Sequence, residues 1–150
     1  MKKQVFCLLP SLWLLTACSG SAPMLGVHQQ LLQACPDSPN CVISQAANDG
    51  NYIQPLVYQG TMLQAQQRLL QILKAEKRSH IVTQQINYLR VEFHSALFGF
   101  VDDVEFYLLA QQNEHILIHV RSAARLGYYD FGVNRQRIEH IRSELSNQTK

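Results

Sequence analysis

Four polar side chains in the second half of the chain could carry acid–base chemistry. Asp103 and Glu105 alternate with apolar residues, and so do His119 and Arg121 further along the chain. A carboxylate beside an imidazole is a common pair for general acid–base catalysis, and an arginine can hold an anionic substrate. In neighbouring antiparallel strands, residues directly opposite each other share a face. A short turn between the two segments then predicts Glu105 opposite His119 and Asp103 opposite Arg121.

A solvated sheet face explains the same residues without any chemistry. Arg90 is expected next to Glu105, and Glu92 or His94 next to Asp103, so this face would carry complementary charges. Cross-strand ion pairs on an exposed face each contribute only roughly a few tenths of a kcal/mol to stability. The sequence leaves both explanations open.

Known catalytic patterns narrow the classes of enzyme. Ser122 and His119 lie three positions apart on one expected strand, so their side chains point to opposite faces and do not form a nucleophile–base pair. The sequence has no Gly-x-Ser-x-Gly elbow, no phosphate-cradling loop and no His-Glu-x-x-His motif. The six histidines are scattered, and His115 and His119, which share one face of an expected strand, have no evident third ligand. We therefore expect neither a metal nor a cofactor.

The hydrophobic pattern predicts two helices around a run of antiparallel strands. Thr61 and Gln64 have the spacing of a capping box, and apolar residues then recur at helical spacing up to a polar stretch at residues 76–79. Alternation over residues 81–86, 88–94, 101–109 and 115–122 predicts about four strands. Asn134 is expected to cap the second helix. This order predicts a two-layer α+β domain with both helices on the oily face of the sheet.

Arginines gather in the last third of the chain. Over residues 121–144, five arginines face three acidic residues, whereas residues 90–114 carry five acidic residues and one arginine. The two regions either neutralise each other inside the fold or leave an arginine-lined pocket for a carboxylate or phosphate. Asp102 is expected on the oily side of the sheet, partnered by Arg125 or by amides of the following loop. The candidate ligand-binding residues are Asp103, Glu105, His119, Arg121, Arg125, Asp130, Asn134 and Arg137.

The N-terminal residues have the parts of a secretory signal. Lys2 and Lys3 precede an apolar run, residues 5–15, that is too short to span a bilayer. The stretch Leu15-Thr16-Ala17-Cys18 follows and resembles the lipobox of bacterial lipoproteins. The resemblance implies cleavage before Cys18 and lipid attachment to its sulfur. Because Ser19 rather than aspartate follows, it also implies an outer-membrane location facing the periplasm. An ordinary secretory signal with an incidental cysteine is the alternative.

Loss of residues 1–17 would change the net charge of the chain and leave two cysteines in addition to Cys18. The full chain has 13 Lys and Arg against 11 Asp and Glu, and two of the lysines lie in the signal. The remaining side chains are then neutral overall, which argues against nucleic acid as a partner. Residues 18–34 would form the lipid anchor and a flexible tether, and residues 35–147 a single domain. In an oxidising compartment Cys35 and Cys41 would form a disulfide, with free thiols or a metal site as alternatives.

Five further stretches resemble a known protein family. They are Cys35-Pro-Asp-Ser-Pro-Asn-Cys-Val, Tyr88-Leu-Arg-Val-Glu-Phe, Phe98-Gly-Phe-Val-Asp-Asp-Val-Glu-Phe, and His119-Val-Arg-Ser-Ala-Ala-Arg-Leu-Gly with Asp130-Phe-Gly-Val-Asn-Arg-Gln-Arg-Ile. In this order they are similar to the bacterial domain-of-unknown-function 1499 family over residues 35–142. The resemblance implies no activity or partner. It does imply that the acidic turn, at Asp102 and Asp103, and the arginine loop, Arg125 to Asn134, belong to one unit. Ala124 and Tyr129 depart from the usual pattern, which weakens the case for a catalytic loop at residues 122–129.

Two main functions are consistent with these observations. The first is a membrane-anchored envelope module that binds an envelope protein or a small anionic ligand. The second is a hydrolase or transferase acting on a cell-envelope component, with Glu105 and His119 as its acid–base pair. A concave pocket holding Glu105, His119 and Arg121 within mutual reach would favour the enzyme. A purely structural role is the third alternative.

Overall fold

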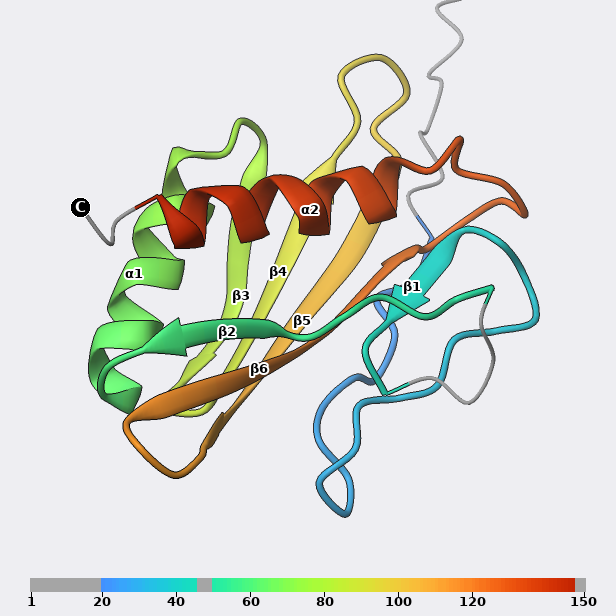
Figure 1. Cartoon of the computed structure of the whole chain (residues 1–150). Coiled ribbons are helices and arrows are strands. Elements are labelled where there is room, and N and C mark those ends of the chain that lie inside the picture. Colours follow the sequence, from blue (N-terminus) through green and yellow to red (C-terminus); the bar gives the residue numbers. More distant parts are fainter. Residues whose placement is uncertain (1–19, 46–49, 148–150) are drawn as a thin grey trace, which may run out of the picture.

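A six-stranded antiparallel sheet with two helices on one face makes up the domain. The computed structural model describes residues 20–45 and 50–147. The strands are β1 (Cys41–Ile43), β2 (Leu56–Gln59), β3 (Ser79–Gln85), β4 (Tyr88–His94), β5 (Val101–Ala110) and β6 (His115–Ala124), and the helices are α1 (Met62–Ala75) and α2 (Val133–Ser146). The sheet has the order β1–β6–β5–β4–β3, and β2 also pairs with β6 (Figure 1). The predicted α+β class and the two helices are confirmed.

Both helices bury apolar side chains against the same face of the sheet. Thr61 caps α1 with the predicted capping box, because the Thr61 hydroxyl accepts the Gln64 N–H and the Gln64 side chain accepts the Thr61 N–H. Leu69 of α1 and Ile138 of α2 are completely buried with Phe106 of β5. The hydrophobic core therefore lies between the helices and the sheet. No helix within the described ranges is long and apolar enough to cross a membrane.

Two strands of the sheet, β1 and β2, lie outside the four segments in which alternation predicted strands. Both pair with β6, β1 opposite residues 121–123 and β2 opposite residues 115–118. Leu56 of β2 is completely buried. Segments of three and four residues are too short to show alternation in a sequence, and it is their pairing with β6 that makes them strands.

The pairing of β5 with β6 differs by two residues from the predicted register. Glu105 lies opposite Arg121, and His119 lies opposite Tyr107. The hairpin turn is centred on residue 113 rather than on residue 112, because residue 110 pairs with residue 116, and the backbone of Asn113 adopts a φ of 60°. A shift of two residues keeps every side chain on its predicted face but changes its partner.

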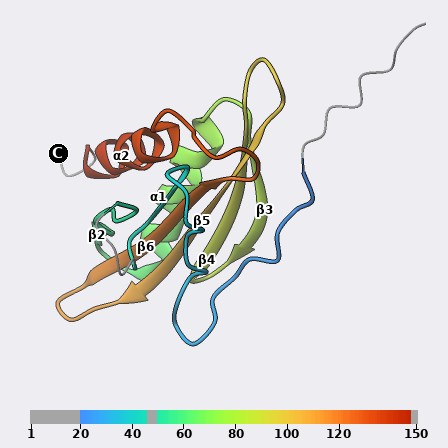
Figure 2. The same cartoon turned by 90° about the vertical axis from the view of Figure 1, so that its right-hand side faces the viewer.

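The second face of the sheet is covered by residues 20–34, which we expected to be a flexible tether. Figure 2 shows this segment on the side of the sheet away from the helices. Leu32 is 5% exposed and packs with Tyr88 and Tyr107 of the sheet. The backbone N–H of Gly26 lies close enough to the Glu105 carboxylate to lower the pKa of that group, against the larger effect of burial. The polar face of the sheet is therefore interior rather than a solvated surface.

Candidate functional site

Asp102 and Asp103 of β5 point to opposite faces of the sheet and bind different arginines. Successive side chains of a strand alternate, so Asp102 faces the helices and Asp103 faces residues 20–34. Asp102 Oδ2 lies 2.6 Å from Nη2 of Arg137 in α2. Asp103 binds Arg125, which directly follows β6. Each aspartate is the centre of a polar cluster, one on each side of the sheet.

The Asp103 cluster consists of Asp103, Arg90, Arg125 and Glu92. Asp103 accepts hydrogen bonds of 2.9 and 2.8 Å from Arg125 and one of 2.8 Å from Arg90. Arg125 also donates to Glu92 at 2.6 Å. Burial opposes the ionisation of Asp103, but Arg125 and Arg90 hold its pKa below the usual value. The hydrogen bond to Asp103 in turn raises the pKa of Arg125. The two arginines and the two carboxylates of the Asp103 cluster therefore neutralise each other's charge.

Glu105 and Arg121 form a second buried pair on the same face, with poorer contacts. Glu105 is 0% exposed and Arg121 is 6% exposed, yet Oε2 and Nη1 are 3.6 Å apart. The Tyr88 hydroxyl donates to Glu105 Oε1 at 2.8 Å, whereas Glu105 Oε2 and Arg121 Nε have no hydrogen-bond partner among the described residues. Burial raises the pKa of Glu105 and lowers that of Arg121. Burial, followed by the charge of Glu105, raises the pKa of Tyr88.

The structure does not bring together the acid–base pair that we expected. His119 Nδ1 lies 3.1 Å from the hydroxyl of Ser44, while Glu105 has Arg90 and Arg121 as its cross-strand neighbours. The predicted pairings of Arg90 with Glu105 and of Glu92 with Asp103 are confirmed. Burial lowers the pKa of His119, which favours its neutral ring. Within residues 20–45 and 50–147, no three His, Cys, Asp or Glu side chains are placed to hold a metal ion.

The Asp102 cluster consists of Asp102, Arg137, Ser122 and Asn134 on the helix side of the sheet. Arg137 Nη1 donates to the Ser122 hydroxyl at 3.1 Å and to Asn134 Oδ1 at 2.7 Å. The Ser122 hydroxyl donates to the same Asn134 oxygen at 2.5 Å. Ser122 and Asn134 are both completely buried, and the Arg137 guanidinium lies 4.6 Å from the centre of the Phe93 ring. The partner of Asp102 is thus Arg137 rather than the predicted Arg125.

Asp130, not Asn134, caps the second helix. The N-cap residue of α2 is Gly132, with a left-handed φ of 77°, and it has no side chain to cap the helix. The Asp130 carboxylate accepts the N–H of Gly132 at 3.0 Å and the N–H of Asn134 at 2.9 Å. Burial opposes its ionisation, but these hydrogen bonds lower the pKa of Asp130. Asn134 lies inside the helix, where its side chain is free to join the Asp102 cluster.

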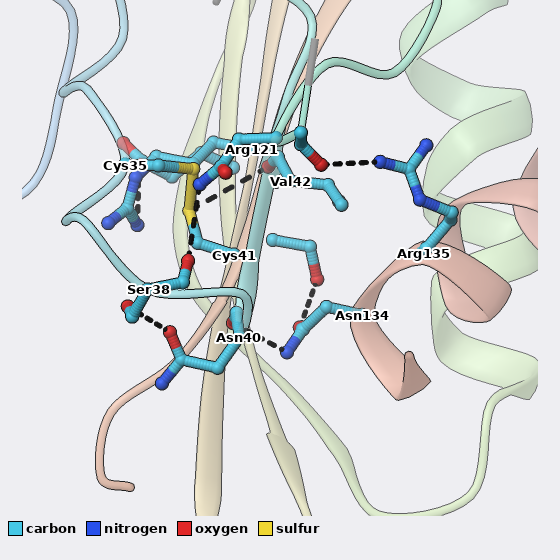
Figure 3. The surroundings of a disulfide bond; sticks show 12 residues. Cys35, Ser38, Asn40, Cys41, Val42, Arg121, Asn134 and Arg135 are labelled. Atoms are coloured by element: carbon cyan, nitrogen blue, oxygen red, sulfur yellow. Dashed lines mark hydrogen bonds and ion pairs between the residues drawn. A yellow bond between two sulfur atoms is a disulfide. The ribbon is translucent and has the colours of Figure 1, made fainter. Parts of the chain in front are cut away.

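The disulfide between Cys35 and Cys41 holds the start of β1 against this cluster (Figure 3). Asn40 immediately precedes Cys41 and is buried. Its carbonyl accepts from Asn134 Nδ2 at 3.2 Å, and its side chain donates to the carbonyl of Gly127 at 2.5 Å. Asn40 was not among the predicted site residues. Its position inside the cysteine loop, directly before a disulfide cysteine, was the available signal.

Both clusters fix the ends of one loop, the β6–α2 loop of residues 125–132. Asp103 holds Arg125 at its start, and Asp102 holds Arg137 in the first turns of the following helix. Asp130 fixes the loop from within. The prediction that the acidic turn and the arginine loop form one unit is confirmed by these contacts.

The comparison with protein families agrees with this arrangement. A family model described as a protein of unknown function, DUF1499, matches residues 31–145. The chain belongs to the DUF1499 family. A search of curated proteins gave no match. In this DUF1499 domain, the motif residues that suggested the resemblance lie mainly in the two clusters and the loop between them. They include Asp102, Asp103, Ser122, Arg125, Asp130, Asn134 and Arg137.

Two neighbouring hollows open at the end of the DUF1499 domain that carries the β6–α2 loop. The first is a cleft of about 370 Å³ between the α1–β3 turn and α2, and Lys77, Arg78, His94, Arg137 and His140 are among its lining residues. The second is an apolar groove of about 400 Å³ between the β4–β5 and β6–α2 loops, with Phe100, Leu126, Tyr129 and Phe131 in its walls. Of the eight candidate residues, Arg137 lines the cleft and Asp130 lines the groove.

Proposed function

We propose that the protein is a lipid-anchored module of the bacterial outer membrane that faces the periplasm and binds a small anionic ligand. The anchor is inferred from Lys2 and Lys3, the apolar run and the stretch Leu15-Thr16-Ala17-Cys18. These residues lie outside the described part of the chain. The Cys35–Cys41 disulfide supports the proposal, because disulfides persist in oxidising compartments such as the periplasm.

The cleft beside α2 is the observation that carries the ligand proposal. Lys77 and Arg78 are exposed at its rim, and Arg137 lies in its wall. Its two carboxylates already have partners, Glu76 with His140 at 2.9 Å and Asp102 with Arg137 at 2.6 Å. The cleft therefore carries excess positive charge, which suits a carboxylate or phosphate group.

The arginines on the other face of the sheet are poorer candidates for the same role. Arg90 and Arg125 already bind Asp103, and residues 20–34 cover Glu105 and its neighbours. An incoming anion would have to displace a buried carboxylate from an arginine, which is costly in a poorly solvated interior. The cleft requires no such exchange.

The anchor is tested by the mass of the N-terminal peptide after expression of the full chain in a bacterium. Cleavage before Cys18 with acyl chains on that residue is the expected result, and a Cys18→Ser chain should lack the added mass. An intact N-terminus, or a cleaved and unacylated one, would contradict the anchor.

Ligand binding is tested by thermal unfolding of the full chain with inorganic phosphate or citrate, against chloride at equal ionic strength. An anion at about ten times its Kd stabilises the folded state by about 1.4 kcal/mol. For a domain of this size, that is a rise in Tm of about 5 °C. The double variant Lys77→Gln/Arg78→Gln should lose the rise, whereas Lys74→Gln, an exposed lysine outside the cleft, should keep it. An equal rise in both variants would refute the cleft as the binding site.

A further inference from the structure

Exposed apolar side chains are concentrated at one end of the domain. Within the described residues, fifteen large apolar side chains are exposed, and eight of them lie in residues 97–100 or 126–133. These two stretches form the tip of the β4–β5 loop and most of the β6–α2 loop. Leu97 and Phe131 are 86% and 83% exposed, and Phe98 and Tyr128 are also largely in solvent. A monomeric soluble protein rarely leaves such a patch uncovered.

The charges around the patch have the arrangement of a membrane-binding surface. No charged residue occurs between His94 and Val101, or between Arg125 and Asp130. Lys77 and Arg78 lie beside the patch, because the cleft that they line shares Ser95, Asp102 and Val133 with the apolar groove. Aromatic side chains with flanking cations suit the boundary between lipid headgroups and acyl chains.

The backbone of Phe131 is held in a conformation that its side chain disfavours. Phe131 has a φ of 55°, and left-handed backbone is costly for a bulky residue. Its ring nevertheless lies mostly in solvent and makes a T-shaped contact with Tyr129, with ring centroids 5.3 Å apart. The hydrogen bonds of Asp130 to Gly132 and Asn134 hold this turn in place. A strained residue whose ring stays mostly exposed indicates a role outside the folded domain.

The N-terminal end of the described chain lies at the same end of the domain. A methyl group placed on Gly20 would come within 3.2 Å of Leu126 and 3.3 Å of Arg125. Only Ser19 separates Gly20 from Cys18, so an acyl chain on Cys18 would start beside the apolar patch.

We propose that this end of the domain docks on the bilayer surface, with Leu97, Phe98, Tyr128 and Phe131 inserted among the lipids. The orientation rests on the proposed anchor at Cys18, because a chain of two residues cannot carry the membrane far from Gly20. The patch itself does not depend on acylation. Docking also places the cationic cleft level with the lipid headgroups.

The test measures how deeply each loop enters the bilayer. Trp13 is the single tryptophan of the chain. In a full chain carrying Trp13→Phe, the substitutions Phe131→Trp, Phe98→Trp and Ile86→Trp each introduce one fluorescent probe. Ile86 is a matched control, because it is also exposed but lies in the β3–β4 hairpin at the opposite end of β4. The protein is expressed in a bacterium, and each variant is mixed with vesicles of phosphatidylethanolamine and phosphatidylglycerol whose acyl chains carry bromine.

Insertion to a depth of about 5–10 Å should quench tryptophan at positions 131 and 98 about twofold or more relative to position 86. Equal quenching at all three positions would overturn the docking proposal. The mass of the N-terminal peptide is measured on the same samples, so the anchor is scored separately. An acylated chain with equal quenching refutes docking alone, whereas an unacylated chain with selective quenching refutes the anchor alone.

The same vesicles distinguish a lipid surface from a protein partner. Amide hydrogen exchange of residues 126–132 should slow when vesicles are added to the chain with the native loops. The double variant Phe98→Ser/Phe131→Ser should lose this protection while keeping the circular dichroism of the native fold. If the vesicles leave exchange of these residues unchanged, the patch does not bind lipid and a protein partner becomes the explanation.

Discussion

Replacing Asp103 with asparagine should destabilise the domain more than any change to an exposed ion pair. Asp103 is 1% exposed and accepts three charge-assisted hydrogen bonds from Arg90 and Arg125. Asparagine keeps one acceptor oxygen, but its NH2 group would face arginine N–H donors. Among the described residues, Glu92 at 3.9 Å would be the carboxylate left in an ion pair with Arg90. Removing one partner of a buried ion pair costs about 3–5 kcal/mol.

Glu139→Gln is the matched control, because Glu139 pairs with Arg142 at the same 2.8 Å but the two side chains are 52% and 29% exposed. An exposed pair contributes about 0–1 kcal/mol. In urea unfolding with an m value of about 2 kcal/mol/M, Asp103→Asn should lower the midpoint by about 2 M and Glu139→Gln by less than about 0.5 M. Equal small shifts would refute the conclusion that the covered sheet face is a poorly solvated interior.

The pH dependence of the stability of Asp103→Asn tests whether the lost charge causes the destabilisation. The pKa of Asp103 is lower in the folded state than its unfolded value of about 3.9. Its contribution to the free energy of unfolding is therefore present above about pH 4 and is lost as the pH falls through the folded pKa. The difference in stability between the native chain and Asp103→Asn should shrink below about pH 4. A difference independent of pH would mean that shape, and not charge, causes the loss.

Three further changes test the remaining contacts, each by urea unfolding. Glu105→Leu or Arg121→Met alone should cost about 3–5 kcal/mol, but the double variant should cost much less, because a loosely bonded buried pair is replaceable by apolar side chains; additive losses would contradict this. Asn134→Ala should cost about 2 kcal/mol or more, since it leaves the buried partners of its amide unpaired, and a loss below about 0.5 kcal/mol would contradict the cluster. Cys35→Ser/Cys41→Ser should cost about 2 kcal/mol by the chain-entropy model, and reductant should then have no further effect on stability.

The class of the fold followed from periodicity, and its details depended on contacts far apart in the sequence. The alternation of residues 101–109 and 115–122 was sufficient to predict both strands and their faces. The partner of each residue depended on where one hairpin turn is centred, which propensity alone does not determine. β1 and β2 exist because they pair with β6, and residues 20–34 are ordered where Leu32 and Gly26 contact the sheet.

In the candidate site too, the sequence predicted which residue types lie on each face, but not all of their partners. The polar face was predicted with its residues, including Arg90 beside Glu105. Its covering was not predicted, because residues 20–34 are small and polar enough to resemble a linker. Asp102 was expected to have a partner, since a carboxylate on the oily side requires one. That partner is Arg137 rather than Arg125, because the loop between these arginines carries each to a different face of the sheet.

The two clusters are better explained as supports for a binding surface than as a catalytic centre. Their charges are neutralised within the fold, and their bonds hold both ends of the β6–α2 loop. Between those ends, the loop exposes Tyr128 and Phe131 and keeps Phe131 in a costly backbone conformation. A loop that served only to connect β6 with α2 would need neither buried arginines at its ends nor aromatic rings in solvent. The rigid support therefore indicates that the position of those rings matters, and a surface outside the domain, such as the proposed bilayer, is what they can reach.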